Sequence, residues 1–254
     1  MRFSLLVLTL PLLSLANVPS KVPTPSSIDR QRAEAEENYR RGVQLAEGDG
    51  VPKNYEAAVE FYRKAAQAGH AAAQYDLAFL YENSLGVAQD FKKAAFWYRK
   101  SAEQGDAEAQ NNLGAMYAKG QGVPRSDAKA LHWYRLAAEQ GDPEGISNLG
   151  TMYLQGRAVK RDFVQAFELF RRAANLGYAV AQNNLALMYA NGQAVGKDYV
   201  WAYAWLDIAA AEGFGCAELR DRIGAEMTPV DRARALNLAN RKREELTQRK
   251  EPKR

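Results

Sequence analysis

Residues 107–142 read AEAQNNLGAMYAKGQGVPRSDAKALHWYRLAAEQGD. The same 36-residue pattern recurs without gaps from residue 71 to residue 214, and a weaker copy covers residues 35–70. A unit this short cannot enclose a core alone, so five consecutive copies must bury their apolar residues against one another. The period therefore predicts an array of stacked units rather than one globular core.

Each unit is predicted to form two helices joined by a short loop. In residues 107–142, Ala109, Leu113 and Met116 recur at helical spacing after an aspartate, a residue type that caps helices. A glycine ends the second helix of every unit. The second helices have cap residue types at one repeat position: Asn54, Asp90, Ser126, Asp162 and Asp198. We predict an all-α solenoid of antiparallel helix pairs, five 36-residue repeats followed by C-terminal capping helices, over residues 29–240.

Small residues at two repeat positions predict where helices approach closely. In the first helix they are Gly42, Ala78, Gly114, Gly150 and Ala186, and in the second helix Ala58, Ala94, Ala130, Ala166 and Ala202. Large side chains follow the second set by three residues: Phe61, Trp97, Trp133, Leu169 and Trp205. We expect these large side chains to pack over the small ones.

The N-terminal end differs from the repeats. Residues 1–16 have one early positive charge, an apolar run and small residues before Asn17, the pattern of a secretory signal cleaved after Ala16. Residues 17–28 are rich in proline and serine and are predicted to be a flexible spacer, with Asp29 capping the first helix. The signal predicts export to the periplasm. Secretion from the cell, or tethering to the inner membrane by an uncleaved signal, are the alternatives.

The C-terminal end combines a closing helix with a basic tail. Thr228 and Asp231 have the spacing of a capping box, which predicts a helix through Leu236 and Ala239. Residues 241–254 hold seven Lys or Arg and three Glu, a difference of +4 that equals the net charge of the whole chain. We expect a solvated chain end; the alternative is a weak contact with an acidic surface.

Few residues in the chain suit catalysis or metal binding. Cys216 is the single cysteine, and His70 and His132 are the two histidines, so no internal disulfide or cysteine metal site can form. The sequence lacks GxSxG, HExxH, CxxC and P-loop motifs. We predict no enzyme activity, no catalytic residue, no cofactor and no metal. The alternative is an enzyme of cell-wall sugars, peptides or β-lactams that uses two carboxylates such as Glu108 and Glu144.

These patterns resemble those of the Sel-1-like repeat (SLR) family, relatives of the tetratricopeptide repeats. The shared strings are A-x-x-x-x-x-L-G-x-x-Y, G-x-G-V and W-Y-R-x-A-A-E-Q-G over residues 35–214. The resemblance implies a right-handed superhelix of antiparallel helix pairs and an adaptor role in protein complexes. A cysteine-rich branch of the family has been linked to penicillin binding and β-lactamase activity; this chain lacks its cysteine pairs, so that activity is not expected.

The first helices of the units are expected to line a concave surface that binds a protein or an extended peptide. Amides there could pair with a peptide backbone, since each offers a donor and an acceptor; the alternative is that they bond only to neighbouring helices. The candidate residues lie off the core stripe: Tyr39, Val43, Tyr75, Asp76, Phe79, Asn111, Asn112, Ser147, Asn148, Thr151, Asn183, Asn184 and Leu187.

The predicted function is an exported, non-catalytic protein-binding scaffold, in envelope complex assembly or signalling. A secreted factor that contacts a host is the alternative within the same class. The recurring WYR strings fall at core spacing, so they predict packing contacts and no nucleic-acid partner.

Overall fold

Helices form nearly all of the regular structure. The computed structural model describes residues 26–250, with side chains to residue 248. Within that range the chain forms twelve α-helices and no strand, which confirms the all-α prediction. The helices are α1 (Ser27–Glu47), α2 (Tyr55–Gln67), α3 (Ala71–Asn83), α4 (Phe91–Ala102), α5 (Ala107–Lys119), α6 (Asp127–Glu139), α7 (Pro143–Gln155), α8 (Phe163–Ala174), α9 (Ala179–Asn191), α10 (Tyr199–Ala211), α11 (Ala217–Ala225) and α12 (Pro229–Lys250).

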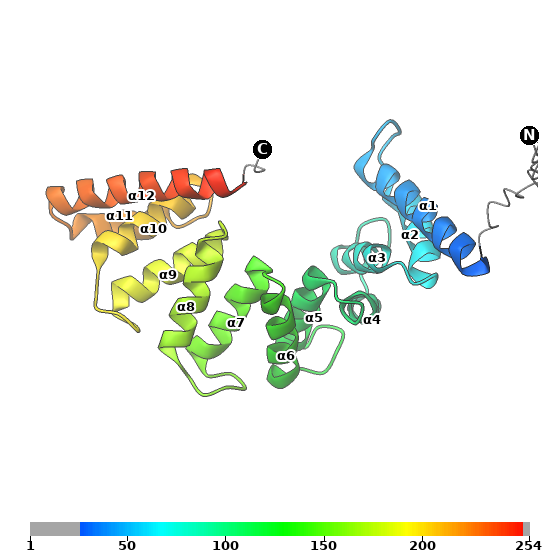
Figure 1. The fold of residues 1–254 in the computed structure, drawn as a ribbon, viewed down its shortest axis with the longest axis horizontal. Helices are drawn as coiled ribbons and strands as arrows, with labels where there is room; N and C mark the ends of the chain where they lie inside the picture. Colours follow the sequence, from blue (N-terminus) through cyan, green and yellow to red (C-terminus); the bar gives the residue numbers. More distant parts are fainter. Residues whose placement is uncertain (1–25, 251–254) are drawn as a thin grey trace, which may run out of the picture.

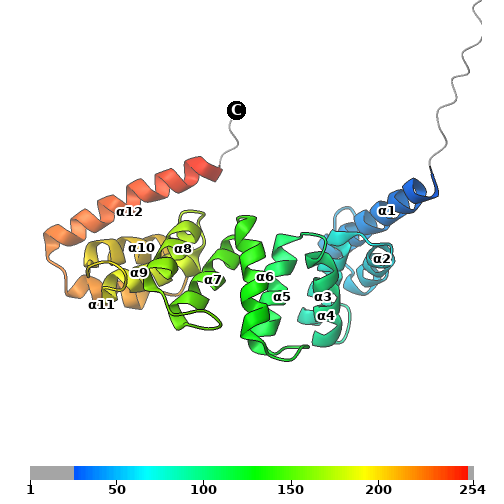
Figure 2. The ribbon, with the colours of Figure 1, turned by 60° about the horizontal axis from the view of Figure 1, so that its bottom comes forward.

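The helices stack as pairs along an arc. Each unit contributes one pair, from α1 with α2 in unit 1 (residues 35–70) to α9 with α10 in unit 5 (residues 179–214), and each pair packs on the next. Figure 1 shows the arc with both ends turned to the same side, and Figure 2 shows its curvature from a second direction. Because most contacts join helices adjacent in sequence, the fold is a solenoid.

The helix boundaries follow from capping side chains. Each predicted cap of a second helix accepts a hydrogen bond from a backbone amide in the first turn. Asp106 and Asp142 cap α5 and α7 in the same way. His70 caps α3, since its Nδ1 accepts from the Ala73 amide at 3.2 Å. Tyr178, at the same repeat position, provides α9 with no side-chain cap.

The first helix begins earlier than predicted. Ser26 is its cap, with Oγ accepting from the Asp29 amide at 3.1 Å, and the Asp29 carboxylate accepts from the Ser26 amide at 3.1 Å. Asp29 is therefore the third residue of a capping box and not the cap itself. Residues 27 and 28, predicted as the end of the spacer, are helical. The signal at residues 1–16 and the rest of the spacer lie outside the described residues.

Close helix approach at the small residues is confirmed. A Cβ at Gly114 would lie 2.8 Å from the Tyr134 ring, so only glycine fits there without movement. In unit 3 the large residue is not the predicted one: Tyr134 lies four residues after Ala130, whereas the half-buried Trp133 lies three after it. In unit 4 the predicted Leu169 does lie beside Gly150, together with the Phe170 ring, and in unit 5 the predicted Trp205 is buried. Residues i and i+4 point along the same helix face more closely than i and i+3 do, which explains the shift. The buried rings at this position are Tyr62, Tyr98, Tyr134 and Phe170.

The arginine of the repeated WYR string, or of its FYR equivalent in unit 1, links units 1, 2 and 3 to the unit that follows. Arg99 Nη2 donates to the Tyr117 hydroxyl at 2.8 Å, and Arg63 donates to Tyr81 at 3.5 Å. A contact of this kind at fixed sequence separation joins α4 to α5 and α2 to α3. The prediction that these strings serve packing is supported by this recurrence.

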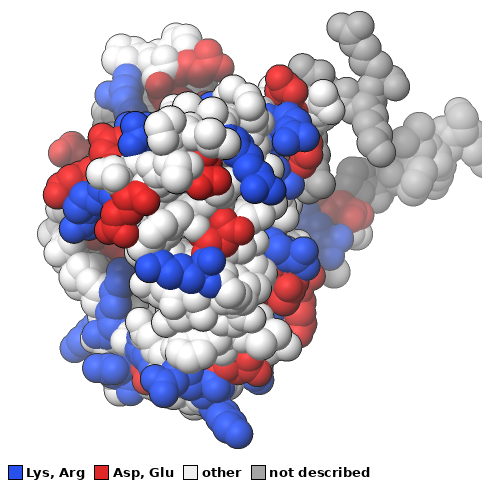
Figure 3. Space-filling view, turned by 90° about the vertical axis from the view of Figure 1, so that its left-hand side faces the viewer, with Lys and Arg blue, Asp and Glu red and all other residues white. Residues whose placement is uncertain are grey.

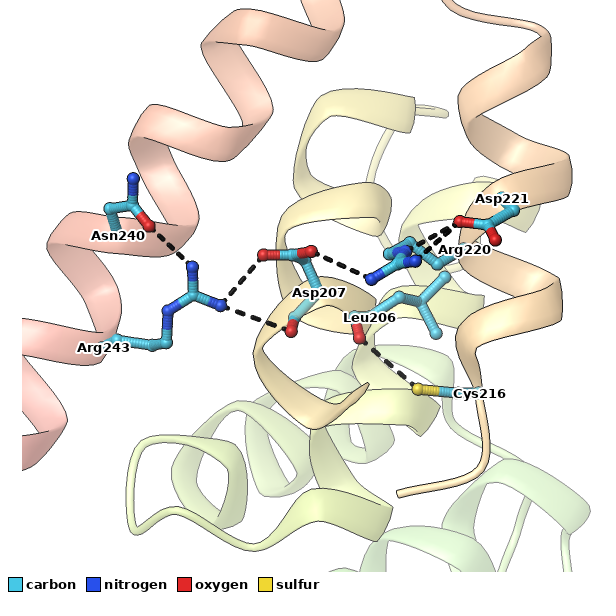
Figure 4. A network of polar contacts seen from close by, with 7 residues as sticks. All are labelled: Leu206, Asp207, Cys216, Arg220, Asp221, Asn240 and Arg243. Carbon is cyan, nitrogen blue, oxygen red and sulfur yellow. Dashed lines mark hydrogen bonds and ion pairs between the residues drawn. The ribbon is translucent and has the colours of Figure 1, made fainter. Parts of the chain in front are cut away.

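The C-terminal cap is held by a buried stripe and an ion-pair network. Thr228 Oγ1 accepts from the Asp231 amide at 3.1 Å, so the predicted start of the closing helix α12 is confirmed. Asp207 on α10 accepts from Arg220 of α11 at 3.2 Å and from Arg243 of α12 at 2.9 Å (Figure 4). One carboxylate thereby fixes three helices.

The predicted basic tail is partly wrong. Helix α12 continues to Lys250, and Leu246 is buried together with Ala235 and Ala239. These residues follow at intervals of four and seven, so the apolar stripe of the cap extends past residue 241. The first part of the predicted tail 241–254 belongs to the cap; residues 251–254 lie outside the described part of the chain.

Two further properties are established for residues 26–250. No helix in this range combines the length and the apolar character needed to cross a membrane. The same range holds no group of three or more His, Cys, Asp or Glu side chains placed to bind a metal ion.

Candidate functional site

The first helices of the units form the inner face of the arc. Figure 1 shows α3 and α5 on its inner side, with α4 and α6 outside them. The inner helices also contact one another: α5 packs against α7, and Asn148 Nδ2 donates to Asn111 Oδ1 at 2.8 Å. Curvature thus brings inner helices of successive units within reach of one partner.

A central pocket of about 230 Å³ lies across three consecutive units, units 2 to 4. Its walls come from α3, α5 and α7 and from the residue before α9, with no contribution from a second helix. Two tyrosine rings face three carboxylate side chains and two amides in this pocket. The lining residues are Tyr75, Glu108, Asn111, Asn112, Asp142, Pro143, Glu144 and Tyr178.

An N-terminal pocket of about 360 Å³ lies between α1, α2 and α3. Aromatic rings form much of its wall, and the exposed ring of Phe79 stands at its edge with 42% of its surface accessible. The Tyr39 ring stacks on His70 with centroids 4.4 Å apart, which fixes one wall. The lining residues are Tyr39, Val43, Ala46, Glu47, Lys53, Tyr55, Tyr62, Asp76, Phe79 and Leu80.

The electrostatics of the N-terminal pocket centre on Asp76. Burial raises the pKa of this carboxyl to about 6, although a hydrogen bond from the Tyr39 hydroxyl acts to lower it. The negative charges of Asp106, Glu108 and Glu47 raise that pKa further. Burial also raises the pKa of Tyr39 to about 12, so its hydroxyl remains a donor at neutral pH. The pocket is acidic and lined by hydroxyl donors and aromatic rings.

The structure brings the predicted partner-binding residues into two groups and leaves others outside them. Tyr39, Val43, Asp76 and Phe79 line the N-terminal pocket. Tyr75, Asn111 and Asn112 line the central pocket. The remaining predicted residues line neither pocket: Ser147, Asn148, Thr151, Asn183, Asn184 and Leu187.

Two of the predicted residues are almost completely buried. Asn111 and Ser147 are each 2% exposed, because α5 and α7 approach closely at this point. Asn111 accepts its hydrogen bond from Asn148, so this pair of amides bonds between neighbouring helices. The burial of Asn111 and Ser147 leaves little surface for a partner, and their role in binding stays a prediction.

Sequence reasoning missed several pocket residues. Tyr55 and Tyr62 come from the second helix of unit 1, whereas only first helices were expected to line the surface. Tyr178 had a usable signal, since it replaces the capping aspartate found at Asp106 and Asp142. A residue that replaces a stabilising helix cap without capping the helix itself is a candidate for a binding role.

A smaller third pocket lies at the other end of the arc, between α10 and α12. It holds about 220 Å³ and is lined by Asp198, Val200, Trp201, Arg234, Leu238 and Arg241. Figure 3 views this end of the molecule: basic and acidic side chains mix over most of it, and basic ones gather along the lower margin. The contact with an acidic surface stays a prediction.

Comparison with known proteins agrees with the repeat pattern. The family described as Sel1 repeat matches residues 38–70, 71–106, 107–142, 143–178 and 179–214. None of the curated proteins compared with the chain matches it.

Two solved structures are similar in both sequence and fold. A protective antigen of uropathogenic Escherichia coli strains, which displays an SLR fold, is 35% identical with a TM-score of 0.79 over 89% of this chain. The chain spans 50% of the length of that protein. A Sel1 repeat protein from Oxalobacter formigenes is 33% identical with a TM-score of 0.72, covering 83% of this chain and 86% of its own. The matched segments make up most of the sequence, and the chain belongs to the Sel1 repeat family.

Proposed function

We propose that this chain is an exported, non-catalytic scaffold that binds a protein or an extended peptide along its inner face. Sel1 repeat domains generally mediate protein–protein interactions. The observation that carries the proposal is the central pocket, whose walls come from the inner helices of successive units. A site built across units suits a ligand that extends along the arc, because each unit then supplies one part of it.

The residues that line the two pockets define which enzyme alternative has to be tested. Neither the N-terminal nor the central pocket is lined by Ser, Cys or His among the described residues. A serine or cysteine nucleophile with a histidine base is therefore absent from these two linings, whereas carboxylates that could act in hydrolysis, such as Glu108 and Glu144, do line the central pocket. Hydrolysis of wall fragments or of a β-lactam by the purified chain, lost in Glu108→Gln or Glu144→Gln, would instead support the enzyme alternative.

Site-specific photo-crosslinking tests the binding face. A benzophenone amino acid replaces Phe79 on the inner face or, as a matched control, Phe96 on the outer helix α4, which is 50% exposed. We expect a defined adduct from position 79 in the producing cells and none from position 96. Adducts from position 96 alone, or from neither position, would refute binding on the inner face.

Export needs its own experiment. The N-terminal pattern supports it, and so does the E. coli relative, whose description as a protective antigen fits a protein outside the cytoplasm. Fractionation with N-terminal sequencing should find a chain that begins at Asn17 in the periplasmic fraction. A full-length chain in the cytoplasm would overturn this part of the proposal, and a cleaved chain in the medium would favour the host-contact alternative.

A further inference from the structure

The N-terminal pocket combines features that suit a cation. Four aromatic side chains, Tyr39, Tyr55, Tyr62 and Phe79, line a space of about 360 Å³ together with the carboxylate of Asp76. Ring faces attract cations through their quadrupole, and a carboxylate supplies full charge complementarity. An apolar wall beside an acidic point matches a side chain with a hydrocarbon stem and a charged end.

Two of these residues depart from the pattern of the other units. Units 3, 4 and 5 have Asn112, Asn148 and Asn184 where unit 2 has Asp76. At the Phe79 position the same units have Ala115, Thr151 and Leu187. The repeat therefore folds without an acid or an aromatic ring at these two positions.

Both departures act against stability. The surroundings of Asp76 disfavour its charged form, and Phe79 leaves 42% of a large apolar side chain in water. Local features that oppose the fold are expected at functional sites, where binding supplies the compensation. A cation beside Asp76 would relieve the first penalty, and a hydrocarbon stem against Phe79 would relieve the second.

We infer that the N-terminal pocket binds a lysine or arginine side chain of the partner, with its stem against Phe79 and Val43 and its charged end at Asp76. The inference rests on the proposed function, since it assigns the chemistry of one contact within that binding face. The second carboxylate of the pocket, Glu47, adds to the attraction.

Lys53 also lines the pocket, so its role has to be distinguished from that of a ligand. Its Nζ lies 4.7 Å from the centroid of the Tyr55 ring. In unit 5 the equivalent Lys197 Nζ lies 4.3 Å from the centroid of the Tyr199 ring, although these two residues line neither the N-terminal nor the central pocket. The contact of Lys53 is therefore a feature of the repeat, and Lys53 is not among the charges that act on Asp76.

Binding should depend on pH because Asp76 must be ionised. The groups that act on it are the Tyr39 hydroxyl and Glu47 of α1, Tyr62 of α2, and Asp106 and Glu108 at the start of α5. None of these groups carries a positive charge, so none of them stabilises the ionised form of Asp76 as a cationic side chain would. Below about pH 6 the carboxyl takes up a proton, and its attraction for a cation is lost.

NMR titration with short peptides tests the inference on the whole chain. The probe is a nine-residue Gly-Ser peptide with one central lysine or arginine, and the control peptide has norleucine, which keeps the stem and lacks the charge. At pH 7.5 the basic peptides should shift amides around Asp76, Phe79 and Val43 and saturate. Norleucine should bind at least ten-fold more weakly, and lysine binding should weaken at least ten-fold at pH 5.

Variants borrowed from the chain's own repeats provide matched controls. Asp76→Asn and Phe79→Ala introduce residues that unit 3 already has, and each should weaken lysine binding at least ten-fold in a folded chain. Glu139→Gln and Phe96→Ala make the same chemical changes on the outer helices and should leave the affinity unchanged. Equal binding of norleucine and lysine, wild-type affinity in Asp76→Asn, or no shift with any probe would overturn the inference.

The outcome is separable from that of the proposed function. If crosslinking at position 79 captures a partner that Asp76→Asn still captures equally well, the scaffold stands and the cation pocket fails. If the lysine peptide binds at Asp76 but position 79 yields no adduct in cells, the pocket stands and the scaffold proposal fails.

Discussion

Units 3 and 4 differ at two equivalent positions where the first helix meets the end of the preceding or following second helix: unit 3 has two glutamines, and unit 4 has two apolar residues. In unit 3, Gln110 Nε2 donates to the Ala102 carbonyl at 3.1 Å, and Gln110 Oε1 accepts from Gln140 Nε2 at 2.8 Å. In unit 4 the two equivalent positions hold Ile146 and Leu176. Unit 2 repeats the polar version with Gln74 and Gln104. Units 2 and 3 therefore have a hydrogen-bonded pair of amides at these positions, whereas unit 4 has two apolar side chains, of which Ile146 is buried and Leu176 is 47% exposed.

Unit 5 shows what happens when the pair is mixed. Gln182 retains the buried amide, but Glu212 stands where units 2 and 3 have a glutamine. A carboxylate has no N–H to donate, and neither side-chain polar atom of Gln182 has a hydrogen-bond partner among the described residues. An unsatisfied buried amide costs about 1–3 kcal/mol. We therefore expect this contact to stabilise unit 5 less than the equivalent contact stabilises units 2 and 3.

The loops between paired helices also differ between units 2 and 3 and units 4 and 5: one loop position holds glycine in the former and alanine in the latter. Gly86 and Gly122 have positive φ angles of 68° and 69°, and units 4 and 5 adopt the same conformation with Ala158 at 56° and Ala194 at 68°. A Cβ at Gly122 would lie 1.9 Å from the Phe91 carbonyl oxygen, in the preceding unit. The loop of unit 3 is therefore pressed against its neighbour more closely than an alanine allows.

Gly122→Ala should produce the largest loss. The left-handed conformation costs a non-glycine residue about 1–2 kcal/mol, and the clash with Phe91 adds to it, so we expect a loss of about 3 kcal/mol or more in the free energy of unfolding. Urea unfolding followed by circular dichroism measures it. Gly196→Ala is the control, because nothing lies within 4 Å of its Cβ position. A loss below about 1 kcal/mol would show that the loop can move away.

Breaking the polar pair should cost somewhat less. Gln110→Ile removes the hydrogen bonds of Gln110 to the Ala102 carbonyl and the Gln140 amide, for a loss of about 1–2 kcal/mol, since Ala102 still accepts from the Gly105 amide at 3.0 Å. Adding Gln140→Leu places the two apolar residues of unit 4 in unit 3 and should restore most of the stability that Gln110→Ile loses. A double-mutant cycle measures this coupling. In unit 5, where Gln182 has no hydrogen-bond partner among the described residues, Gln182→Ile should instead be neutral or stabilise the chain by about 1 kcal/mol. Additive losses from the two unit 3 changes would refute the pairwise interpretation.

Asp76→Asn should stabilise the chain in a pH-dependent way. The pKa of Asp76 is about 6 when folded against 3.8 as the model-compound value, so the folded state binds the proton more tightly. The contribution of Asp76 to the free energy of unfolding of the wild-type chain is therefore largest below about pH 4. It is lost as the pH rises through 6. We expect the variant to gain about 1–2 kcal/mol at pH 7 and almost nothing at pH 4. A gain that is the same at both pH values would exclude the carboxylate as its source.

Much of the fold could be predicted from the sequence because its signals are local. Caps such as Asp90, glycines at helix ends and the apolar stripe through Leu113 each act within a few residues, and each recurs five times or nearly so. The end of the solenoid was harder. Leu246 extends the stripe of the closing helix, but the surrounding basic residues pointed to a solvated tail.

The binding surface was harder to predict because it depends on contacts between units. Period alone marks Asn111 and Asn183 as equivalent, yet Asn183 is half-buried, whereas Asn111 is buried where α5 packs against α7. Tyr62 reaches the N-terminal pocket from the second helix of unit 1, and the period alone does not distinguish it from Tyr98 and Tyr134, which line neither pocket. Only the departures from the repeat, such as Asp76 and Phe79, could have indicated this site from sequence.

Ala194→Gly should have the smallest effect and tests the loop comparison from the other side. Removing the Cβ relieves about 1–2 kcal/mol of left-handed strain, while the extra freedom of glycine in the unfolded chain takes back about 0.5–1 kcal/mol. A net gain of about 0.5 kcal/mol in urea unfolding is expected, and Ala158→Gly should match it. A loss in both variants would mean that the two alanines make contacts worth more than the strain. The loops of units 4 and 5 would then be adapted to alanine, as the loop of unit 3 is to glycine.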